Sequence, residues 1–284
     1  MQDRVWLVTG ATSDIGREIA LHALQRGDTV VAAGRRPEAL QDLARMGCKI
    51  LVLDITSSAE EFNHTVEDVT KKVGRIEMLI NAAGFLLEGC MEETSDRELL
   101  QVYSTNLFGL LRLRVAVLPQ MRSRRQGVIA NVARIGALQV AIGAGVFCSS
   151  KAAMTCATEA LHAETSPLGI NVCSIQLGHF RTAFLSPGPR LKTQITLADC
   201  DVFMESTRKI FDDFDGSQQG DSKEAGRVIV EVLIQSERAE GRCIPGCLAV
   251  GSDVAAATEK VQSSREVEMK AWALLSHSTD LTGS

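Results

Sequence analysis

The sequence predicts an α/β protein with a doubly wound parallel sheet of about seven strands in the order 3-2-1-4-5-6-7. Two observations predict this class. Short apolar runs without period-two alternation recur along the 284 residues, as is typical of strands that are buried on both faces. Stretches with the apolar spacing of helices separate these runs, so parallel strands joined by right-handed crossovers are expected.

The first expected strand, at residues 5–8, leads into a turn that contains glycine and then into a helix. Gly10 allows a sharp exit from the strand, and Gly16 has no side chain, so the helix can lie close to the strand with its first amides exposed. Exposed amides at the positive end of a helix dipole form a site for a diphosphate. The turn residues expected to hold a phosphate-bearing cofactor are Gly10, Thr12, Asp14, Ile15 and Gly16.

The remaining elements are expected in the order of the chain. We expect further strands at residues 29–33, 50–53, 76–80, 128–132, 170–175 and, as a short one, 242–244. We expect helices at residues 38–46, 96–122, 144–166, 222–235 and 253–275. Residues 180–221 are polar and lack a regular pattern, which indicates an irregular substrate loop. No linker, repeat or low-complexity stretch divides the chain, so one domain is expected over residues 1–284.

Composition and charge argue against several classes of protein. The net charge is −5 and the densest basic cluster, at residues 122–126, is short, so neither nucleic acid nor a membrane is an expected partner. The eight cysteines are scattered and the histidines do not cluster, so we expect no metal site and reduced thiols in a cytoplasmic protein. We also expect no signal peptide and no membrane span. A small molecule is the expected partner.

Polar residues follow the expected strands at the edge where doubly wound sheets bind ligands, among them Asp54, Asn81 and Gly84. Arg35 and Arg36 stand where an acidic residue would hold the ribose diol of NAD. A guanidinium at that place suits a 2′-phosphate, so the sequence favours NADP(H). The alternative is a solvated basic turn before the next helix.

Six motifs in this order resemble those of the short-chain dehydrogenase/reductase family, and together they cover nearly the whole chain. They are VTGATSDIG, LDIT, INAAG, STNLFG, SSKAA and LGHFRT, which begin at residues 8, 53, 80, 104, 149 and 177. In that family they supply the phosphate turn, the adenine contact, the N-N-A-G segment, the helix asparagine, the catalytic lysine and the loop over the nicotinamide. The resemblance implies a Rossmann domain, often a homodimer or homotetramer, that binds NADP(H) through residues including Asn81, Ala82, Gly84, Lys151 and Thr182.

The chain departs from this family at the catalytic centre. The family's proton-donating tyrosine stands four residues before the lysine, and that position is Phe147. The serine that bonds the same substrate oxygen corresponds to Arg134. A phenyl ring offers no proton and a guanidinium keeps its own, so only Asn106 and Lys151 of the tetrad remain. The middle glycine of the turn is Asp14, which either approaches the phosphates or points to solvent and caps the helix.

Other groups offer a replacement for the missing proton donor. His179 is the strongest candidate, because its loop should lie beside the nicotinamide and imidazole exchanges protons near neutral pH; a structural or solvent-facing role is the alternative. Tyr103, the only tyrosine, shares a helix face with Asn106 and is better explained as packing. Arg134 could polarise a substrate carbonyl or hold an anion, unless it pairs with a carboxylate or reaches solvent.

Three functions fit this pattern. The first is a natural-product tailoring enzyme that catalyses iminium reduction or a non-redox cyclisation, isomerisation or cycloaddition, similar in kind to fungal relatives of short-chain reductases that act as iminium reductases and Diels–Alder cyclases. The second is an NADPH-dependent ketone reductase in which His179 or water gives the proton. The third is a non-catalytic binding or assembly protein, which needs no enclosed cavity. An enzyme is favoured if apolar residues of the segment at 180–221 line a cavity; the alternative is that they only pack this segment on the domain. These residues are Phe180, Phe184, Leu185, Leu191, Phe203, Met204 and Phe211.

Overall fold

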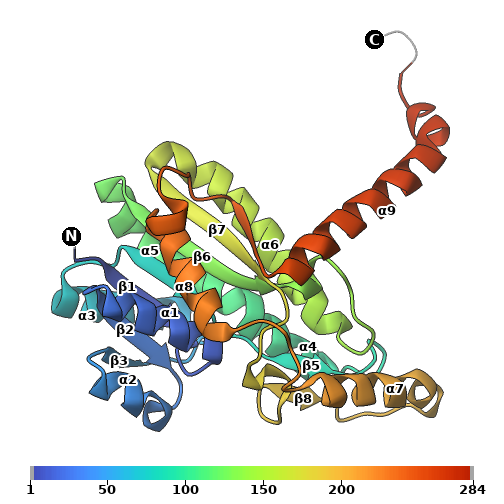
Figure 1. Ribbon diagram of the computed structural model, residues 1–284, viewed down its shortest axis with the longest axis horizontal. Coiled ribbons are helices and arrows are strands. Elements are labelled where there is room, and N and C mark those ends of the chain that lie inside the picture. Colours follow the sequence, from blue (N-terminus) through green and yellow to red (C-terminus); the bar gives the residue numbers. More distant parts are fainter. Residues whose placement is uncertain (1–2, 282–284) are drawn as a thin grey trace.

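The computed structural model describes residues 3–281 and has a parallel sheet of seven strands at its centre (Figure 1). The strands lie in the order β3-β2-β1-β4-β6-β7-β9. Counted among these seven alone, this is the predicted order 3-2-1-4-5-6-7, so the predicted fold class is confirmed. The strands are β1 (Val5–Thr9), β2 (Thr29–Gly34), β3 (Lys49–Val52), β4 (Met78–Asn81), β6 (Gly127–Arg134), β7 (Ile170–Leu177) and β9 (Cys247–Val250).

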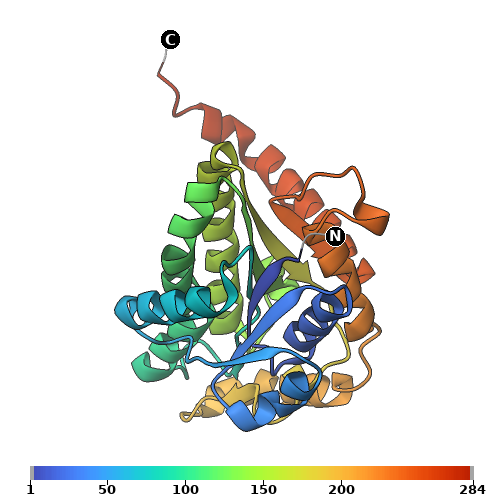
Figure 2. The same ribbon diagram turned by 90° about the vertical axis from the view of Figure 1, so that its left-hand side faces the viewer.

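Helices cover both faces of the sheet (Figure 2). Ile19 and Ile229 are buried in the core on one face, and Phe62 and Leu113 are buried in the core on the other. Because both faces are covered, the strands are apolar throughout, which is the pattern seen in the sequence. The covering helices are α1 (Asp14–Gln25), α2 (Gln41–Arg45) and α8 (Ser222–Leu233) on the first face, and α3 (Ala59–Val73), α5 (Gly109–Arg124) and α6 (Gly145–Thr165) on the second.

The helix predicted at residues 96–122 is interrupted near its middle. It consists of α4 (Asp96–Tyr103), a π-helical turn (Ser104–Phe108) and α5. Such turns are frequent at functional sites, because they re-aim a side chain without ending the helix. Here the turn carries the fully buried Asn106.

Residues 180–221, which we call the lid, are more regular than predicted. They contain β8 (Arg190–Lys192), which pairs in parallel with β5 (Leu86–Glu88), and the long helix α7 (Ala198–Phe214). Arg190 donates hydrogen bonds to the buried Glu88 and, at 2.7 Å, to Asp212. The prediction of an irregular loop is therefore wrong. In Figure 1 the lid lies together with β5 at one end of the sheet, apart from the N-terminal strands.

The C-terminal part of the chain also differs in detail from the prediction. The last strand is β9, at residues 247–250, whereas residues 242–244 are not a strand. The final helix α9 (Ser252–His277) packs on the sheet through Val254 and Ala257, and its later part projects away from the body (Figure 1). No helix among residues 3–281 is both long and apolar enough to cross a membrane. The extent of the domain, residues 1–284, stays a prediction.

Candidate active site

The turn after β1 has the shape of a phosphate cradle. Gly10 has a φ of +65°, and a Cβ atom there would lie 2.7 Å from the carbonyl carbon of Ala82. A Cβ at Gly16 would lie 2.4 Å from the carbonyl oxygen of Gly10, so α1 begins in close contact with the turn. Ile15 is buried behind the turn and Thr12 is exposed. The turn therefore presents the start of α1 at the edge of the sheet, as a diphosphate requires.

Asp14 connects this turn to the lid. The residue at the N-cap of α1 is Ser13, whose hydroxyl donates to the carbonyl of Gly10 at 2.6 Å and leaves the helix without a side-chain cap. The Asp14 carboxylate accepts a hydrogen bond of 2.6 Å from the backbone nitrogen of Ala183. The alternative that Asp14 caps the helix is therefore wrong, because Ser13 occupies the capping position and the Asp14 carboxylate bonds the lid instead.

The other predicted cofactor contacts fall into two groups. Arg35 and Asp54 are exposed at the ends of β2 and β3, and within residues 3–281 Arg35 makes no ion pair. Asn81 is buried, and its amide donates to the Asn131 side chain at 2.8 Å. Arg35 and Asp54 thus remain accessible to a ligand, whereas Asn81 ties β4 to β6.

Asn106 and Lys151 meet behind Gly84. The Asn106 side chain accepts from the backbone nitrogen of Phe85 and donates to its carbonyl, both at 3.1 Å. Lys151 is 4% exposed, and its Nζ donates to the carbonyl of Val132 at 2.9 Å. A Cβ at Gly84 would lie 3.1 Å from Asn106 Oδ1 and 3.3 Å from Lys151 Nζ, so only a glycine leaves these two groups unshielded.

The environment of Lys151 changes its acidity. Burial, followed by the charge of Arg134, lowers the pKa of Lys151 to about 7. A charged amine has three hydrogens, and in the described part of the chain only one of them has a partner. The remaining donors are available to the hydroxyls of a bound ligand.

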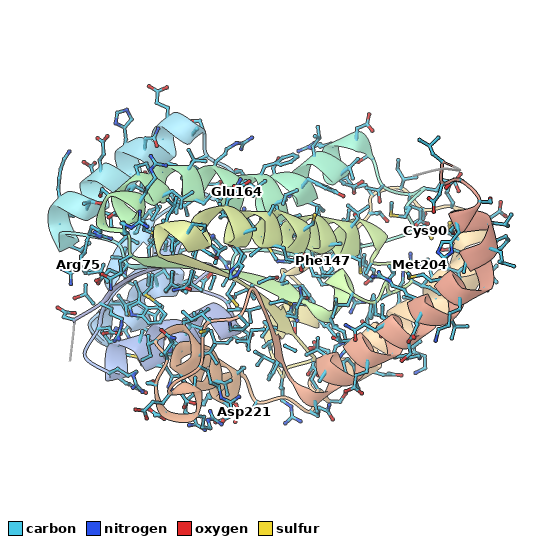
Figure 3. All side chains as sticks on the ribbon, turned by 90° about the horizontal axis from the view of Figure 1, so that it is seen from above. Arg75, Cys90, Phe147, Glu164, Met204 and Asp221 are labelled. Atoms are coloured by element: carbon cyan, nitrogen blue, oxygen red, sulfur yellow. The ribbon has the colours of Figure 1, made fainter. Side chains whose placement is uncertain are left out.

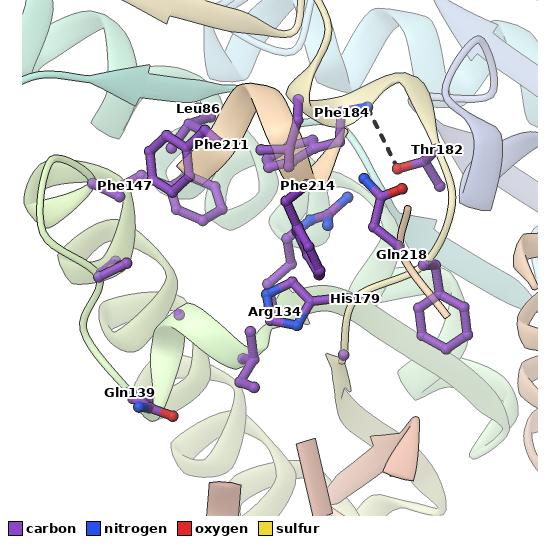
Figure 4. A pocket seen from close by; sticks show the side chains of 18 of the residues that line it. Leu86, Arg134, Gln139, Phe147, His179, Thr182, Phe184, Phe211, Phe214 and Gln218 are labelled. Atoms are coloured by element: carbon purple, nitrogen blue, oxygen red, sulfur yellow. Dashed lines mark hydrogen bonds between the residues drawn. The ribbon is translucent and has the colours of Figure 1, made fainter. Parts of the chain in front are cut away.

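A cavity of about 470 Å³ opens beside these residues (Figure 4). It lies between the end of β6, the start of α6, the loop after β7 and the lid. Four of the apolar residues predicted to line it do so, and Leu191, Phe203 and Met204 do not. The four are Phe180, Phe184, Leu185 and Phe211, and Ile210 and Phe214 of α7 join them.

Phe147 and Arg134 contact the same aromatic ring of the lid. The Phe184 ring centroid is 5.6 Å from that of Phe147 and 3.5 Å from the Arg134 guanidinium carbon. Burial lowers the pKa of Arg134 to about 10, and the nearby Asp14 opposes this effect, so the group is a cation at neutral pH. No carboxylate within residues 3–281 forms an ion pair with it. Tyr103 donates to Ser149 at 3.0 Å and does not line the cavity.

His179 lines the same cavity and is oriented by a residue that the sequence did not reveal. Its Nδ1 lies 2.7 Å from Asp253 Oδ2, which also accepts from the His179 backbone nitrogen at 2.7 Å. Burial alone would raise the pKa of Asp253, but these bonds from His179 hold it below its usual value. The ring packs edge-on against Phe214, with centroids 5.0 Å apart. An ionised Asp253 fixes the proton on Nδ1 and leaves Nε2 for chemistry.

The geometry meets the needs of a nicotinamide dinucleotide. The glycine turn can take the diphosphate, Arg35 a 2′-phosphate, and the buried Lys151 a ribose, all at the carboxyl ends of parallel strands. Thr182 begins the short helical turn of the lid and accepts from the Phe184 nitrogen at 3.4 Å (Figure 4). Arg134 and His179 project into the adjoining cavity (Figure 4). The site therefore combines a cofactor crevice with an apolar pocket that holds one cation and one acid–base group.

Comparison with known proteins agrees with this geometry. Residues 4–189 match the family model described as short chain dehydrogenase. The oxidoreductase claN of Passalora fulva is 35% identical over 189 residues, which are 65% of this chain and 86% of the relative. The 3-ketodihydrosphingosine reductase of Bacteroides thetaiotaomicron is 35% identical over 65% of this chain and 66% of the relative.

Solved structures extend the likeness to nearly the whole chain. A short-chain dehydrogenase from Streptomyces avermitilis superposes with a TM-score of 0.88 at 33% identity, covering 99% of this chain and 100% of that one. ElxO, solved with NADP bound, has a TM-score of 0.71 at 20% identity, covering 90% of this chain and 100% of that one, and shares the fold.

Proposed function

Because this chain belongs to the short-chain dehydrogenase/reductase family, we propose that it is an NADP(H)-dependent reductase of ketones in which His179 replaces the usual tyrosine. This is the second of the three functions that fit the sequence. The observation that carries it is the presence of Arg134 and the His179–Asp253 pair in one aromatic cavity. Bound NADPH supplies the hydride, and the relatives named oxidoreductase and reductase support this class of chemistry.

Lys151 and Asn106 act on the cofactor side of the site. Lys151 has free hydrogens beside Gly84, so it can hold the hydroxyls of a nicotinamide ribose. Asn106 fixes the backbone of Phe85 and keeps this part of the crevice rigid. Phe147 gives no proton, but it holds the lid residue Phe184 over the cavity.

Arg134 acts on the substrate oxygen. Its guanidinium is stacked on Phe184 and lacks a carboxylate partner in the described residues, so its N–H groups are free to bond a carbonyl. As negative charge develops on that oxygen, the guanidinium stabilises it in a cavity lined mainly by apolar side chains. A preorganised donor of this kind contributes about 2.7 to 4 kcal/mol.

His179 then delivers the proton. With Nδ1 bonded to Asp253, a protonated ring gives its Nε2 proton to the substrate oxygen and becomes neutral. The side chain of His179 is 42% exposed, so it can regain a proton from solvent. The product is an alcohol, and His179 returns to its starting state.

The absorbance of NADPH provides the test, with a panel of aryl and alicyclic ketones as substrates. We expect wild-type protein to oxidise NADPH with some of them, and His179→Gln to lower turnover about a hundred- to ten-thousandfold. His64→Gln, a change on the exposed face of α3, is the matched control and should leave turnover unchanged. Equal rates in wild type and His179→Gln would remove His179 from the mechanism. Absence of NADPH binding would overturn the reductase itself and favour the non-catalytic function.

A second candidate is a non-redox reaction of a natural product, such as isomerisation or cyclisation. Phe147 favours it, because the family's proton donor is replaced by a buried ring. In this case neutral His179 removes a proton beside a carbonyl, and Arg134 stabilises the enolate oxygen. Iminium reduction fits less well, because a cationic substrate would be repelled by Arg134.

The double substitution Phe147→Tyr with Arg134→Ser separates these two candidates. It restores the family's proton donor and removes the proposed oxyanion group. A non-redox enzyme should lose its native reaction and gain weak ketone reduction with NADPH. If the wild type already consumes NADPH in each turnover, the non-redox candidate is excluded.

Two further properties complete the proposal. We propose a cytoplasmic enzyme, since all eight cysteines are free thiols. We also propose a homodimer or homotetramer that acts on a small molecule and not on nucleic acid or membranes, as the family resemblance and the net charge of −5 indicate. Size-exclusion chromatography with light scattering measures the number of subunits directly.

A further inference from the structure

A second cluster of reactive side chains lies away from the active-site cavity, where the lid meets the body. Cys90 follows β5, Glu93 lies in the next turn, and Cys200 lies in the first turn of α7. One ligand atom from each residue, two sulfurs and a carboxylate oxygen, lie within 4.8 Å of one another, and all three residues are buried. We call these three residues the thiol cluster. Figure 3 shows Cys90 close to Met204, which packs in the same apolar group.

Glu93 makes this cluster unusual. Its side chain is completely buried, which is costly for a carboxylate without compensation. Its two oxygens accept from the backbone nitrogens of Cys90, at 2.9 Å, and Leu197, at 3.0 Å. These two bonds hold the oxygens in place and leave each with a further lone pair. A fixed anion therefore lies beside two thiols that belong to an apolar group, and the charge of Arg208 acts on this anion and on Cys90.

We propose that Cys90, Glu93 and Cys200 bind one Zn²⁺ ion that fastens the lid to the body. Thiolate sulfur and carboxylate oxygen are common zinc ligands, with bonds of about 2.3 Å and 2.0–2.2 Å. In a tetrahedral site two sulfurs are then about 3.8 Å apart, so a spread of 4.8 Å closes with small side-chain movements. The two thiol protons leave to solvent as the metal binds. Three protein ligands leave the fourth position of a tetrahedral zinc for a further ligand such as water.

Sequence spacing gave no sign of this site, because Cys200 is distant in the chain from Cys90 and Glu93. The pairing arises only when α7 folds over β5. Zinc binding there would stabilise α7, which supplies Phe211 and Phe214 to the cavity. A disulfide between Cys90 and Cys200 is the competing chemistry, but both thiols are buried away from a soluble oxidant.

The full chain, purified without chelator from cells grown with added zinc, tests the proposal by elemental analysis. We expect about one zinc per chain, lost in Cys90→Ser and in Cys200→Ser but kept in Cys156→Ser, which changes an exposed cysteine of α6. Zinc added to chelator-treated wild type should raise its melting temperature, and the same addition should not affect Cys90→Ser.

If the cysteine variants do not fold, a second measurement on the wild type tests whether the thiol cluster binds a metal. Cobalt added to chelator-treated wild type should give the strong absorption of a thiolate-bound metal. Wild type that takes up neither zinc nor cobalt would overturn the proposal. A mass lower by two hydrogens, with a peptide that links Cys90 to Cys200, would overturn it in favour of a disulfide.

Discussion

The cofactor side and the substrate side of the site differ in how far they keep the pattern of the family. On the cofactor side, Asn106 and Lys151 are buried, bonded to backbone groups and placed beside Gly84. On the substrate side, Phe147 and Arg134 replace the groups that would handle a proton, and both contact the lid. Hydride delivery and proton delivery depend on different side chains. The side chains that deliver the proton can therefore change while those that hold the cofactor stay the same.

The buried cations of the two sides also differ in how firmly they keep their protons. Lys151 is buried so deeply that burial lowers its pKa to about 7, and its proton is easily lost. Arg134 keeps its proton because its ordinary pKa is much higher. The fixed cation of the site thus lies on the substrate side, where a developing oxyanion would need it.

Among the tests that compare the two sides, removing that cation has the largest expected effect. Arg134→Ala should lower kcat/KM for the native substrate on the order of a hundredfold or more, since it removes a preorganised donor worth about 2.7 to 4 kcal/mol. Steady-state kinetics measure this, with Arg181→Ala, which changes an exposed arginine of the lid, as control. An unchanged rate would show that Arg134 takes no part in catalysis, and only the shape of the cavity would then remain as a catalytic factor on the substrate side.

Arg35 tests the cofactor side. Arg35→Ala should weaken NADPH binding about ten- to a hundredfold, because a charge-assisted bond contributes about 1.5 to 3 kcal/mol. NADH, which lacks the 2′-phosphate, should be almost unaffected. Isothermal titration with both cofactors gives the ratio, and Arg36→Ala shows whether the neighbouring guanidinium shares the contact. Equal losses for the two cofactors would contradict the assignment.

The buried lysine predicts a dependence of stability on pH. The folded-state pKa of Lys151, about 7, lies below the ordinary 10.5, so between these values the unfolded chain binds more protons at this site. Stability should therefore rise with pH through this window, by about 1.4 kcal/mol per unit, and this contribution is lost as pH falls toward 7. Urea unfolding should show this slope in wild type and a smaller one in Lys151→Met. Parallel curves for the two proteins would mean that Lys151 titrates normally.

The smallest effect is expected at Asp14, where the two sides meet. Asp14→Asn keeps an oxygen for the Ala183 nitrogen but removes a negative charge beside the expected diphosphate. NADPH binding should tighten by less than about fivefold, and the gain should shrink at high salt. Weaker binding of NADPH to the variant would instead show that the charge itself holds the lid.

Much of this molecule follows from local sequence. The strand order, the glycine turn and the approach of Asn106 to Lys151 depend on apolar runs and short motifs, and the structure reproduces them. The helix α7 was missed because its buried positions, among them Cys200 and Met204, are separated by many polar residues. The buried positions of α7 nevertheless recur at helical spacing, so the sequence does contain a signal for this helix.

Other parts could not be predicted, because they arise only from tertiary contacts. Asp253 meets His179 across 74 residues of chain, and neither residue stands in a motif that names the other. The contact between Asp14 and Ala183 has the same origin. Predictions made from motifs identified candidate groups such as His179, and the fold supplied the partner that orients it.

The helix α9 has a consequence for protein engineering. Its first turn carries Asp253, which orients His179, while its later residues project from the body (Figure 1). Trp272 and Leu274 on the projecting part are exposed. An affinity tag, a fluorophore or a surface linker attached there would stay clear of the cavity and yet share one helix with the residue that orients His179.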